Sequence, residues 1–397
     1  MTIEGRRVVL GVSGGIACYK SCTLARRLTE LGADVDVVLT AAAAEFVRPL
    51  TFEALTQRPV ATSLWERSRA LAHIGLAREP DLVVVAPATA HLLARAALGL
   101  ADDLLTALLL ATQAPVLVAP GMNDDMFDHP ATQANLRTLR GRGWTVLGPA
   151  IGPLAEGPSN RPGRMVEPEE IVVQAERMLC SPRGRLSGRR VVVTAGPTRE
   201  PLDAVRVISN RSSGRMGYAL ATRAFARGAD VTLVTGPASV PGPRGPTVVA
   251  VETTADMQTA LERLLPDTDV LLMAAAPSDY RVEEPVTGKR PRQDGAVRIE
   301  LHPTADILAA TAGLRKPKAV IVGFALETGA GLDRAREKLR AKRLDLVVLN
   351  RADEIGSGFE VETNRVTLVS SDGTEELPLL PKMEVADRIL DDVEARL

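Results

Sequence analysis

Aromatic residues are scarce in this chain, which limits the ligands that it can hold by stacking. Phenylalanine, tryptophan and tyrosine together make up 3% of the 397 residues. Proteins that bind single-stranded nucleic acid stack the bases on aromatic side chains. Net charge is nearly absent as well, because 48 Lys and Arg residues balance 49 Asp and Glu residues to give −1. These two shortages exclude a generally basic nucleic-acid-binding protein and an acidic disordered chain.

Cysteine and long apolar runs are also lacking. Three cysteines, Cys18, Cys22 and Cys180, are too few for a disulfide framework. The longest apolar region, 82–120, is interrupted by prolines and charged residues, so it contains no stretch of about 20 apolar residues that would cross a membrane. No cleavage-site pattern follows the first apolar run. We therefore expect a cytoplasmic enzyme with no membrane or nucleic-acid partner.

Lysine is rare compared with arginine. The chain contains 41 arginines and only seven lysines: Lys20, Lys289, Lys316, Lys318, Lys338, Lys342 and Lys382. A lysine that is retained against this background can mark a place where a compact ammonium is preferred to a planar guanidinium. Chance retention is the alternative at any single position.

Short apolar runs separated by helical patterns occur in both halves of the chain. They lie at 8–12, 35–40, 82–86 and 116–119, and again at 191–194, 231–235, 248–251, 270–274, 320–324 and 346–349. Continuous apolar runs are typical of parallel strands that are covered on both faces, and strands alternating with helices predict βαβ units. We therefore predict an α/β fold of two tandem doubly wound sheets, in domains 1–180 and 190–397, joined by the polar, turn-rich linker 181–189.

A glycine-rich segment, 11–17 (GVSGGIA), follows the first strand and opens the first helix. Glycines let the backbone approach an anion, and the N-terminus of a helix favours negative charge. The segment does not match the dinucleotide fingerprint GxGxxG, so it does not predict NAD. A tight turn without a ligand is the alternative.

Four ordered motifs make the first half resemble the flavin-dependent cysteine decarboxylases. They are 14–17 (GGIA), 73–77 (HIGLA), 87–90 (PATA) and 120–126 (PGMNDDM). The resemblance implies a flavodoxin-like domain that binds FMN. FMN supplies the redox step that makes the loss of carbon dioxide from a cysteinyl amide possible.

The same resemblance implies roles for individual residues. His73, which taken alone would more often be structural, becomes a base beside the flavin, and Asn123 binds the substrate carboxylate. The residues expected to bind FMN are Ser13, Gly14, Gly15, Thr40, Pro87 and Thr89, and those expected near the substrate are Met122, Arg164 and Met165.

The chain departs from this family at one position of chemical importance. The family often carries a cysteine in the flap before Gly-Arg-Met as the final proton donor, whereas 154–157 (LAEG) has Glu156 there. A carboxylic acid can donate a proton if burial raises its pKa. The alternative is a slow or altered last half-reaction.

Two segments at the start of the second half indicate a second anion site. The segment 194–203 (TAGPTREPLD) leaves a strand, and 208–217 (ISNRSSGRMG) precedes a helical run, 218–227. Helix capping needs one polar residue, so Asn, two serines and glycine together favour phosphate binding. Lys338 and Lys342 are spaced i, i+4, so on a helix they would face the same way, with an anion between them or with solvent around them.

These segments resemble phosphopantothenate–cysteine ligases over about residues 189–390. The resemblance implies a Rossmann-like nucleotide-binding domain in which CTP and Mg²⁺ activate 4′-phosphopantothenate for attack by cysteine. It assigns Asn210 to the acyl-cytidylate, Lys289 to its formation, and Asp279 as a candidate ligand for Mg²⁺ carried by CTP. Further residues expected at CTP or the phosphopantothenoyl substrates are Ser212, Met273, Ala274, Ala275, Ala305, Asp306, Ile307, Leu308, Phe324, Lys338 and Lys342.

The two resemblances in one chain imply a bifunctional enzyme of coenzyme A biosynthesis. The second domain would make 4′-phosphopantothenoylcysteine, and the first would decarboxylate it to 4′-phosphopantetheine. The family also implies a homo-oligomer, since trimeric decarboxylase domains and dimeric ligase domains are both satisfied by a dodecamer. Two alternatives stay open: an active ligase behind a flavin-binding scaffold that lacks decarboxylase activity, and a tandem NAD-binding protein.

Overall fold

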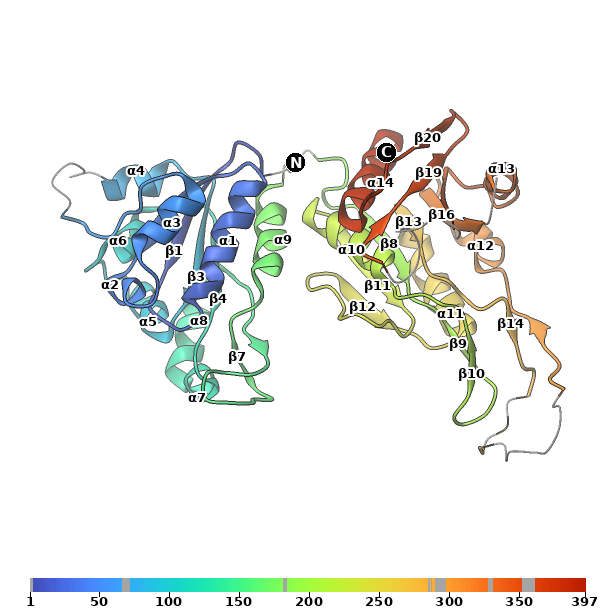
Figure 1. Cartoon of the computed structure of the whole chain (residues 1–397), viewed down its shortest axis with the longest axis horizontal. Coiled ribbons are helices and arrows are strands. Elements are labelled where there is room, and N and C mark those ends of the chain that lie inside the picture. Colours follow the sequence, from blue (N-terminus) through green and yellow to red (C-terminus); the bar gives the residue numbers. More distant parts are fainter. Residues whose placement is uncertain are drawn as a thin grey trace. The chain divides into compact units, whose positions relative to one another are not determined.

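The chain folds into two compact units in a computed structural model (Figure 1). The structure describes residues 3–65, 72–180, 184–284, 286, 288–289, 298–327, 331–351 and 361–397. Contacts within the chain divide it into Met1–Ser181 and Pro182–Leu397. In the segment between the two sheets, Leu186 is fully buried in the core of the second unit.

The first unit is built on a parallel sheet with strand order β2-β1-β3-β4-β5. Its strands are β1 (Arg7–Val12), β2 (Asp34–Leu39), β3 (Leu82–Ala88), β4 (Val116–Pro120) and β5 (Thr145–Val146). This is the flavodoxin-like order, in which the winding direction reverses between β1 and β3. The predicted doubly wound sheet is confirmed.

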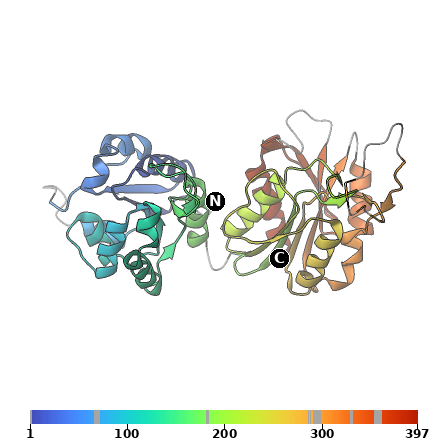
Figure 2. The same cartoon turned by 90° about the horizontal axis from the view of Figure 1, so that it is seen from below.

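Helices cover both faces of this sheet (Figures 1 and 2). They are α1 (Cys18–Glu30), α2 (Ala41–Ala44), α3 (Pro49–Thr56), α4 (Ala72–Arg78), α5 (Ala90–Leu98), α6 (Leu104–Ala111), α7 (Asp124–Asp128), α8 (Pro130–Gly141) and α9 (Pro168–Leu179). Alternate residues of a strand point to opposite faces. Accordingly Val8 and Leu10 pack in the core with α1, α3 and α9, whereas Val9 packs in the core with α5, α6 and α8.

The second unit has a larger sheet with strand order β12-β11-β8-β13-β16-β17-β19-β20. Its strands are β8 (Arg190–Ala195), β11 (Asp230–Thr235), β12 (Thr247–Ala250), β13 (Val270–Met273), β16 (Val320–Glu327), β17 (Leu346–Arg351), β19 (Val366–Val369) and β20 (Thr374–Glu376). The first six strands are parallel and follow the Rossmann order, with the reversal between β8 and β13. The antiparallel β19 and β20 were not predicted, because their runs are too short to stand out from turns.

The helices of the second unit again lie on two faces. One face carries α10 (Arg215–Ala226) and α14 (Lys382–Arg396), and the other carries α11 (Thr254–Leu264), α12 (Ile307–Ala310) and α13 (Leu332–Ala341). Two predicted boundaries are corrected. Helix α10 begins three residues before the predicted 218, because Gly214 caps it in the left-handed conformation. Lys342 lies just beyond α13, as its C-terminal cap.

The described residues also form four two-stranded antiparallel ribbons outside the two main sheets. They pair β6 (Ala150–Ile151) with β7 (Pro162–Arg164), β9 (Arg199–Pro201) with β10 (Val207–Ser209), β14 (Tyr280–Arg281) with β15 (His302–Pro303), and β18 (Thr363–Asn364) with β21 (Leu380–Pro381). In the described part of the chain, none of the helices combines the length and apolar character that crossing a membrane requires.

Ion pairs tie α10 to α14 beneath the sheet of the second unit. Asp387 of α14 lies 2.9 Å from Nε of Arg223, on α10, and 2.8 Å from NH2 of Arg227, the C-terminal cap of α10. The two guanidinium side chains are only 11% and 14% exposed. Removing a carboxylate that faces two nearly buried cations is costly, because the interior loses a negative charge that Asp391, 2.8 Å from Arg227, replaces only in part.

We predict that Asp387→Ala lowers the free energy of unfolding by about 3 kcal/mol, measured by urea denaturation. The control is Asp333→Ala, which removes a carboxylate that is 97% exposed and 3.7 Å from Arg336. The control should change stability by less than about 0.5 kcal/mol. Equal unfolding midpoints for the two variants would contradict the anchoring role of Asp387.

Candidate active sites

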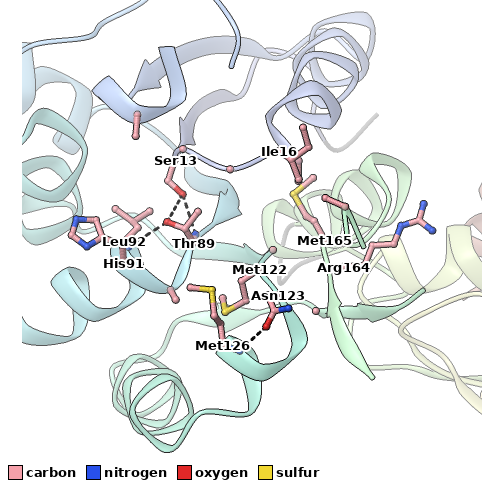
Figure 3. Close-up of a pocket in the computed structure, with 18 of the residues that line it drawn as sticks. Ser13, Ile16, Thr89, His91, Leu92, Met122, Asn123, Met126, Arg164 and Met165 are labelled. Atoms are coloured by element: carbon pink, nitrogen blue, oxygen red, sulfur yellow. Dashed lines mark hydrogen bonds between the residues drawn. The ribbon is translucent and has the colours of Figure 1, made fainter. Parts of the chain in front are cut away.

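A cavity of about 810 Å³ opens in the first unit where β1 and β3 end. Ligands of open α/β sheets bind at the carboxyl ends of the strands, where the winding reverses. Many residues singled out from the sequence line this cavity: Ser13, Gly14, Gly15, Thr40, Thr89, Met122, Asn123, Glu156, Arg164 and Met165. Figure 3 shows several of them converging from the loops after β1, β3 and β4 and from β7.

The glycine-rich loop after β1 has no room for side chains at its centre. A Cβ atom built on Gly14 would lie 2.4 Å from Cβ of Ala42, the second residue of α2. The loop is held on its other side by Ser13, whose buried hydroxyl donates to the Pro87 carbonyl at 2.7 Å and accepts from the Thr89 amide at 3.0 Å. Pro87 does not line the cavity, but its carbonyl holds the side chain of Ser13, which does.

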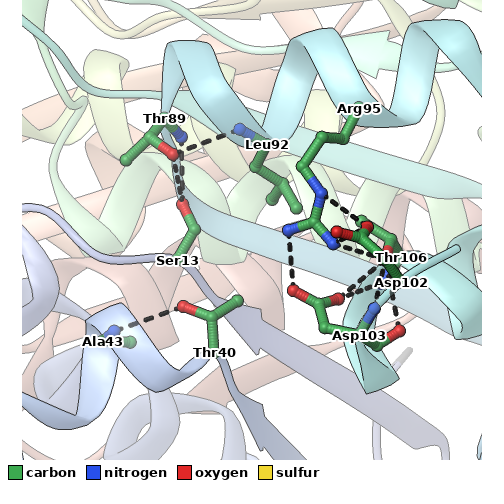
Figure 4. A network of polar contacts seen from close by, with 9 residues as sticks. All are labelled: Ser13, Thr40, Ala43, Thr89, Leu92, Arg95, Asp102, Asp103 and Thr106. Atoms are coloured by element: carbon green, nitrogen blue, oxygen red, sulfur yellow. Dashed lines mark hydrogen bonds and ion pairs between the residues drawn. The ribbon is translucent and has the colours of Figure 1, made fainter. Parts of the chain in front are cut away.

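The two threonines assigned to the flavin also cap helices. Thr40 Oγ1 accepts from the Ala43 amide at 3.2 Å, at the start of α2, and Thr89 Oγ1 accepts from the Leu92 amide at 3.4 Å, at the start of α5 (Figure 4). Both are therefore fixed at the edge of the cavity by local backbone contacts. A ligand that reaches these hydroxyls meets groups that are already oriented.

An ionic network that the sequence analysis did not single out forms another part of the wall. Arg95 and Asp103 line the cavity, and NH1 of Arg95 lies 2.8 Å from Oδ2 of Asp103 (Figure 4). Asp102 pairs with the same guanidinium. Burial by itself would raise the pKa of Asp103, but the bonds from the Thr106 amide and Arg95 outweigh burial and lower it. Asp103 is thus held as an anion beside a cation.

Asn123 joins the turn after β4 to the flap, which we define as residues 152–161. Its Oδ1 accepts from the amides of Asp125 at 2.8 Å and Met126 at 3.2 Å, which caps α7. Its Nδ2 donates to Oε1 of Glu156. Glu156 is exposed at this point, so the burial that the sequence analysis required of a carboxylic acid proton donor is not present. The structure therefore brings the carboxylate-binding candidate and the proton-donor candidate into contact.

The flap is tied to α7 by charge. NH1 of Arg161 lies 2.7 Å from Oδ1 of Asp125, and the same guanidinium pairs with Asp128. Ser159 Oγ donates to Asp124 at 2.6 Å, a bond that, together with backbone amides and Arg161, lowers the pKa of Asp124. These contacts fasten the C-terminal end of the flap.

The Gly-Arg-Met segment packs tightly against the same turn. A Cβ on Gly163 would lie 2.8 Å from the Met122 carbonyl oxygen, so only glycine fits. Lys20, for which no role was predicted, is buried on α1. Its Nζ donates to the Met165 carbonyl at 3.0 Å and to Glu167 at 2.9 Å. It also lines the cavity. The only available signal was the scarcity of lysine.

His73 is the predicted base of this unit. Its backbone lies in the first turn of α4, Ala72–Arg78. Its side chain lies outside the described residues, so its role stays a prediction.

The second unit has two adjoining cavities, of about 400 and 210 Å³, at the carboxyl ends of β8, β13 and β16. Ala275, Asp279, Phe324 and Lys338 line both, so the cavities form one crevice. The larger also contains Asn210, Ser212 and Ala274, and the smaller contains Met273, Ala305, Asp306, Ile307, Leu308 and Lys342. All the residues expected at the nucleotide or substrate, except Lys289, are thus gathered in this crevice.

The segment between β8 and α10 frames the larger cavity. Gly217 lies against β8 so closely that a Cβ would be 2.5 Å from Cβ of Ala195. Asn210 Nδ2 donates to the Pro277 carbonyl at 2.8 Å, which fastens this segment to the loop after β13. The N-terminus of α10, with Ser212 before it, therefore faces the cavity.

A cluster of buried, hydrogen-bonded side chains holds the loop that contains Asp279. Oε1 of Glu200, which is 4% exposed, accepts from the amide and the hydroxyl of Thr254, each at 2.8 Å. Thr254 contacts Thr198 at 2.9 Å, and Thr198 accepts from the Ser278 amide at 2.8 Å. This chain of bonds fixes the residue that precedes Asp279. The sequence analysis missed it, because its members are separated along the chain.

The two lysines expected to share an anion each have a partner in the protein. Lys338 donates to the Phe324 carbonyl at 2.6 Å, and Lys342 lies 2.8 Å from Oδ2 of Asp306. Burial would raise the pKa of Asp306, but the bond from Lys342 and the Ala309 amide lower it. Both lysines therefore line one cavity, and their positive charges do not require a bound ligand to balance them.

Lys289 is exposed and does not line either cavity. Among the residues that the structure describes, no group of three or more His, Cys, Asp or Glu side chains is arranged to hold a metal ion. Three further residues that the sequence analysis missed line the larger cavity: Asn350, Asn364 and Lys382.

Comparisons with known proteins find a matching family model for each of the two units. A family model described as "Flavoprotein" matches residues 1–179, and one described as "DNA/pantothenate metabolism flavoprotein C-terminal domain" matches residues 186–397. The "Coenzyme A biosynthesis bifunctional protein CoaBC" of Vibrio cholerae is 44% identical over 393 residues, covering 98% of each chain. The protein of that name from Mycobacterium tuberculosis is 47% identical over 402 residues, covering 97% of this chain and 96% of the relative.

Among solved structures, a C-terminal domain of CoaBC is similar with a TM-score of 0.46 and 38% identity, over 53% of this chain and 97% of that chain.

We predict that Arg161→Ala loosens the flap, because it removes the cation that bridges the flap to α7. Hydrogen exchange should become several-fold faster at the amides of Leu154 and Gly157, which bond to each other's carbonyls at 2.8 and 3.1 Å. The control, Arg27→Ala, removes an exposed pair with Glu30 on α1 and should leave flap exchange unchanged. Equal exchange in both variants would mean that Arg161 does not restrain the flap.

Proposed function

Because the chain belongs to the family of coenzyme A biosynthesis bifunctional proteins, which combine a decarboxylase with a ligase, we propose how its two units divide the chemistry. The second unit joins cysteine to 4′-phosphopantothenate with CTP, and the first decarboxylates the product with FMN. Family membership sets aside both the scaffold alternative and the tandem NAD-binding alternative. The observation that carries the assignment is that each unit has a cavity at its strand reversal, lined by the motif residues.

The residues of the first cavity fit a bound flavin mononucleotide. A volume of about 810 Å³ lies within the range of cofactor sites, and its lining is largely apolar with a few polar groups, as such sites usually are. The absence of a side chain at Gly14 leaves peptide groups against the cavity, and Ser13, Thr40 and Thr89 supply hydroxyls at its edge. When bound, FMN supplies the reversible two-electron oxidation that lets a cysteinyl carboxylate leave as carbon dioxide.

The protein side of the decarboxylation is positioning and proton transfer. Asn123 Nδ2 binds the carboxylate of 4′-phosphopantothenoylcysteine, and Met122, Arg164 and Met165 bound the same space. His73 acts as the base. Glu156 returns the final proton to the product, after a substrate beneath the flap has displaced water from the carboxyl group.

In the second unit, CTP and the carboxylate substrate occupy the crevice. The nucleotide contacts Phe324, Met273, Ala274 and the segment 305–308. Lys338 and Lys342 neutralise its phosphates, and Ser212 donates a hydrogen bond to them. Mg²⁺ enters with CTP, because it commonly keeps substrate phosphates and water as ligands and uses few protein carboxylates. Asp279, exposed in both cavities, is the candidate carboxylate.

Ligation proceeds in two displacements. An oxygen of the 4′-phosphopantothenate carboxylate bonds to the α-phosphorus of CTP, and pyrophosphate leaves. The cysteine amine then bonds to the acyl carbon, loses a proton, and CMP leaves. Asn210 holds the acyl-cytidylate and Lys289 counters charge during its formation.

We further propose a homo-oligomer, with a dodecamer as the assembly compatible with trimeric decarboxylase and dimeric ligase domains. Exposed apolar side chains in the first unit, among them Leu50, Leu98 and Leu110, support this. Light scattering on the purified protein gives the subunit number, and a monomer would contradict the proposal.

The test of the whole proposal is a coupled assay read by mass spectrometry. Protein loaded with FMN, given 4′-phosphopantothenate, cysteine, CTP and Mg²⁺, should form the cysteinyl amide and then its decarboxylated product. Lys289→Gln should abolish amide formation but still decarboxylate supplied 4′-phosphopantothenoylcysteine, and His73→Asn should show the reverse. Loss of both activities in either variant, or of neither, would refute the assignment of that residue.

We predict that Glu156→Gln slows formation of the saturated product by at least about tenfold, because it removes a positioned acid. Glutamine keeps the shape of the side chain, so binding should change little. Stopped-flow absorbance separates the early redox step, which should be unaffected, from the late proton transfer. Glu45→Gln, at an exposed position outside the cavity, is the control. Unchanged late kinetics would assign the proton to another donor.

A further inference from the structure

Among the residues that the structure describes, the charged side chains lining the larger cavity of the second unit are mostly cations. They are Arg211, Arg215, Lys338 and Lys382, with the single carboxylate of Asp279. Several of these cations have partners in the protein, such as Glu362 for Arg215 and the Phe324 carbonyl for Lys338. An anionic ligand that reaches this cavity would nevertheless be stabilised by the positive charge around it.

Lys382 is the least expected member of this group. It is the first residue of α14 and only 6% exposed, although lysine is rarely buried. Its Nζ donates to the Val361 carbonyl, and its amide donates to the Glu362 carbonyl at 3.0 Å. The pairing of β18 with β21 brings these two segments together.

The surroundings of Lys382 disfavour its charge. Burial first, and then the neighbouring positive charge of Arg215, lower the pKa of Lys382 to about 8, against the opposing effect of Glu362. An anion in the cavity would stabilise the charges of both Lys382 and Arg215. Glu362, which pairs with Arg215, is 78% exposed, so solvent weakens its effect.

The fold places Arg215 and Lys382 at the same cavity. Arg215 is the first residue of α10 and Lys382 the first of α14, and these helices are tied together by Arg223, Arg227 and Asp387. Both side chains line the cavity that contains Ser212. Two polar residues, Asn350 and Asn364, also line this cavity.

We propose that Lys382, with Arg215 beside it, binds a phosphate group of a ligase substrate. The proposal rests on the proposed ligase function. Two substrates carry that chemistry: CTP through its triphosphate, and 4′-phosphopantothenate through its phosphate ester. Lys382 is thus a binding residue of the ligase and responds to pH, since it loses its charge as pH rises through about 8.

The test measures binding to the full-length protein by calorimetry, with CTP and Mg²⁺ alone and with 4′-phosphopantothenate alone. Lys382→Met should weaken at least one ligand about tenfold or more at pH 7. Loss confined to CTP assigns Lys382 to the nucleotide, and loss confined to the other ligand assigns it to the phosphate ester. The matched control is Lys318→Met, since Lys318 is exposed two residues before β16, at the amino ends of the strands.

A second measurement separates binding from a merely structural role. In the native protein the affinity for the responsive ligand should fall between pH 7 and 9.5, and in Lys382→Arg, which stays charged, this fall should disappear. The charged neighbours are Arg211, Arg215, Lys338, Asp279 and Glu362, and all of them are retained in that variant. Thermal unfolding and decarboxylation of supplied substrate verify that each variant is folded.

Two results would overturn the proposal: Lys382→Met binding both ligands as Lys318→Met does, or native affinities that are constant from pH 7 to 9.5. Failure of the native protein to bind either ligand would instead refute the proposed ligase function.

Discussion

Both cavities depend on glycines that let two backbone segments approach more closely than side chains would allow. Gly14 lies against Ala42 in the first unit, and Gly217 lies against Ala195 in the second. Gly14 and Gly217 themselves line the two cavities, at the carboxyl edge of each sheet where the winding reverses.

The two cavities differ in how their charges are balanced. In the first unit Arg95 is paired with Asp103, and the flap cation Arg161 is paired with acids of α7, so the interior is left mainly apolar. In the second unit, among the residues that the structure describes, cations outnumber carboxylates around the larger cavity. The first cavity is therefore lined mainly by apolar groups and paired charges, whereas the second has a lining that favours anions.

The sequence predicted what is local and missed what the topology assembles. Apolar runs revealed the parallel strands of both sheets except β5, whose two residues are too few to form a run, and motifs found the loops at their ends. Nothing local distinguishes Thr89 as a ligand-binding residue from Thr89 as a helix cap, because one hydroxyl serves both purposes. No role could be predicted for Lys20 and Lys382. The carbonyl groups that they bind, of Met165 and Val361, belong to other segments of the chain. The i, i+4 spacing of Lys338 and Lys342 was suggestive, but the helix ends before Lys342.

The amide of Asn123 has a direction as well as a position. Its oxygen accepts from the amides of Asp125 and Met126, which leaves the nitrogen free to donate, as it does to Glu156 of the flap. If a substrate carboxylate takes the place of Glu156, as proposed above, it meets a donor whose orientation is already set by the helix cap, so little rotational freedom is lost on contact. Aspartate would cap α7 equally well, yet it would present an acceptor to an anion. The turn that starts α7 thus also presents a hydrogen-bond donor, which favours an anionic ligand.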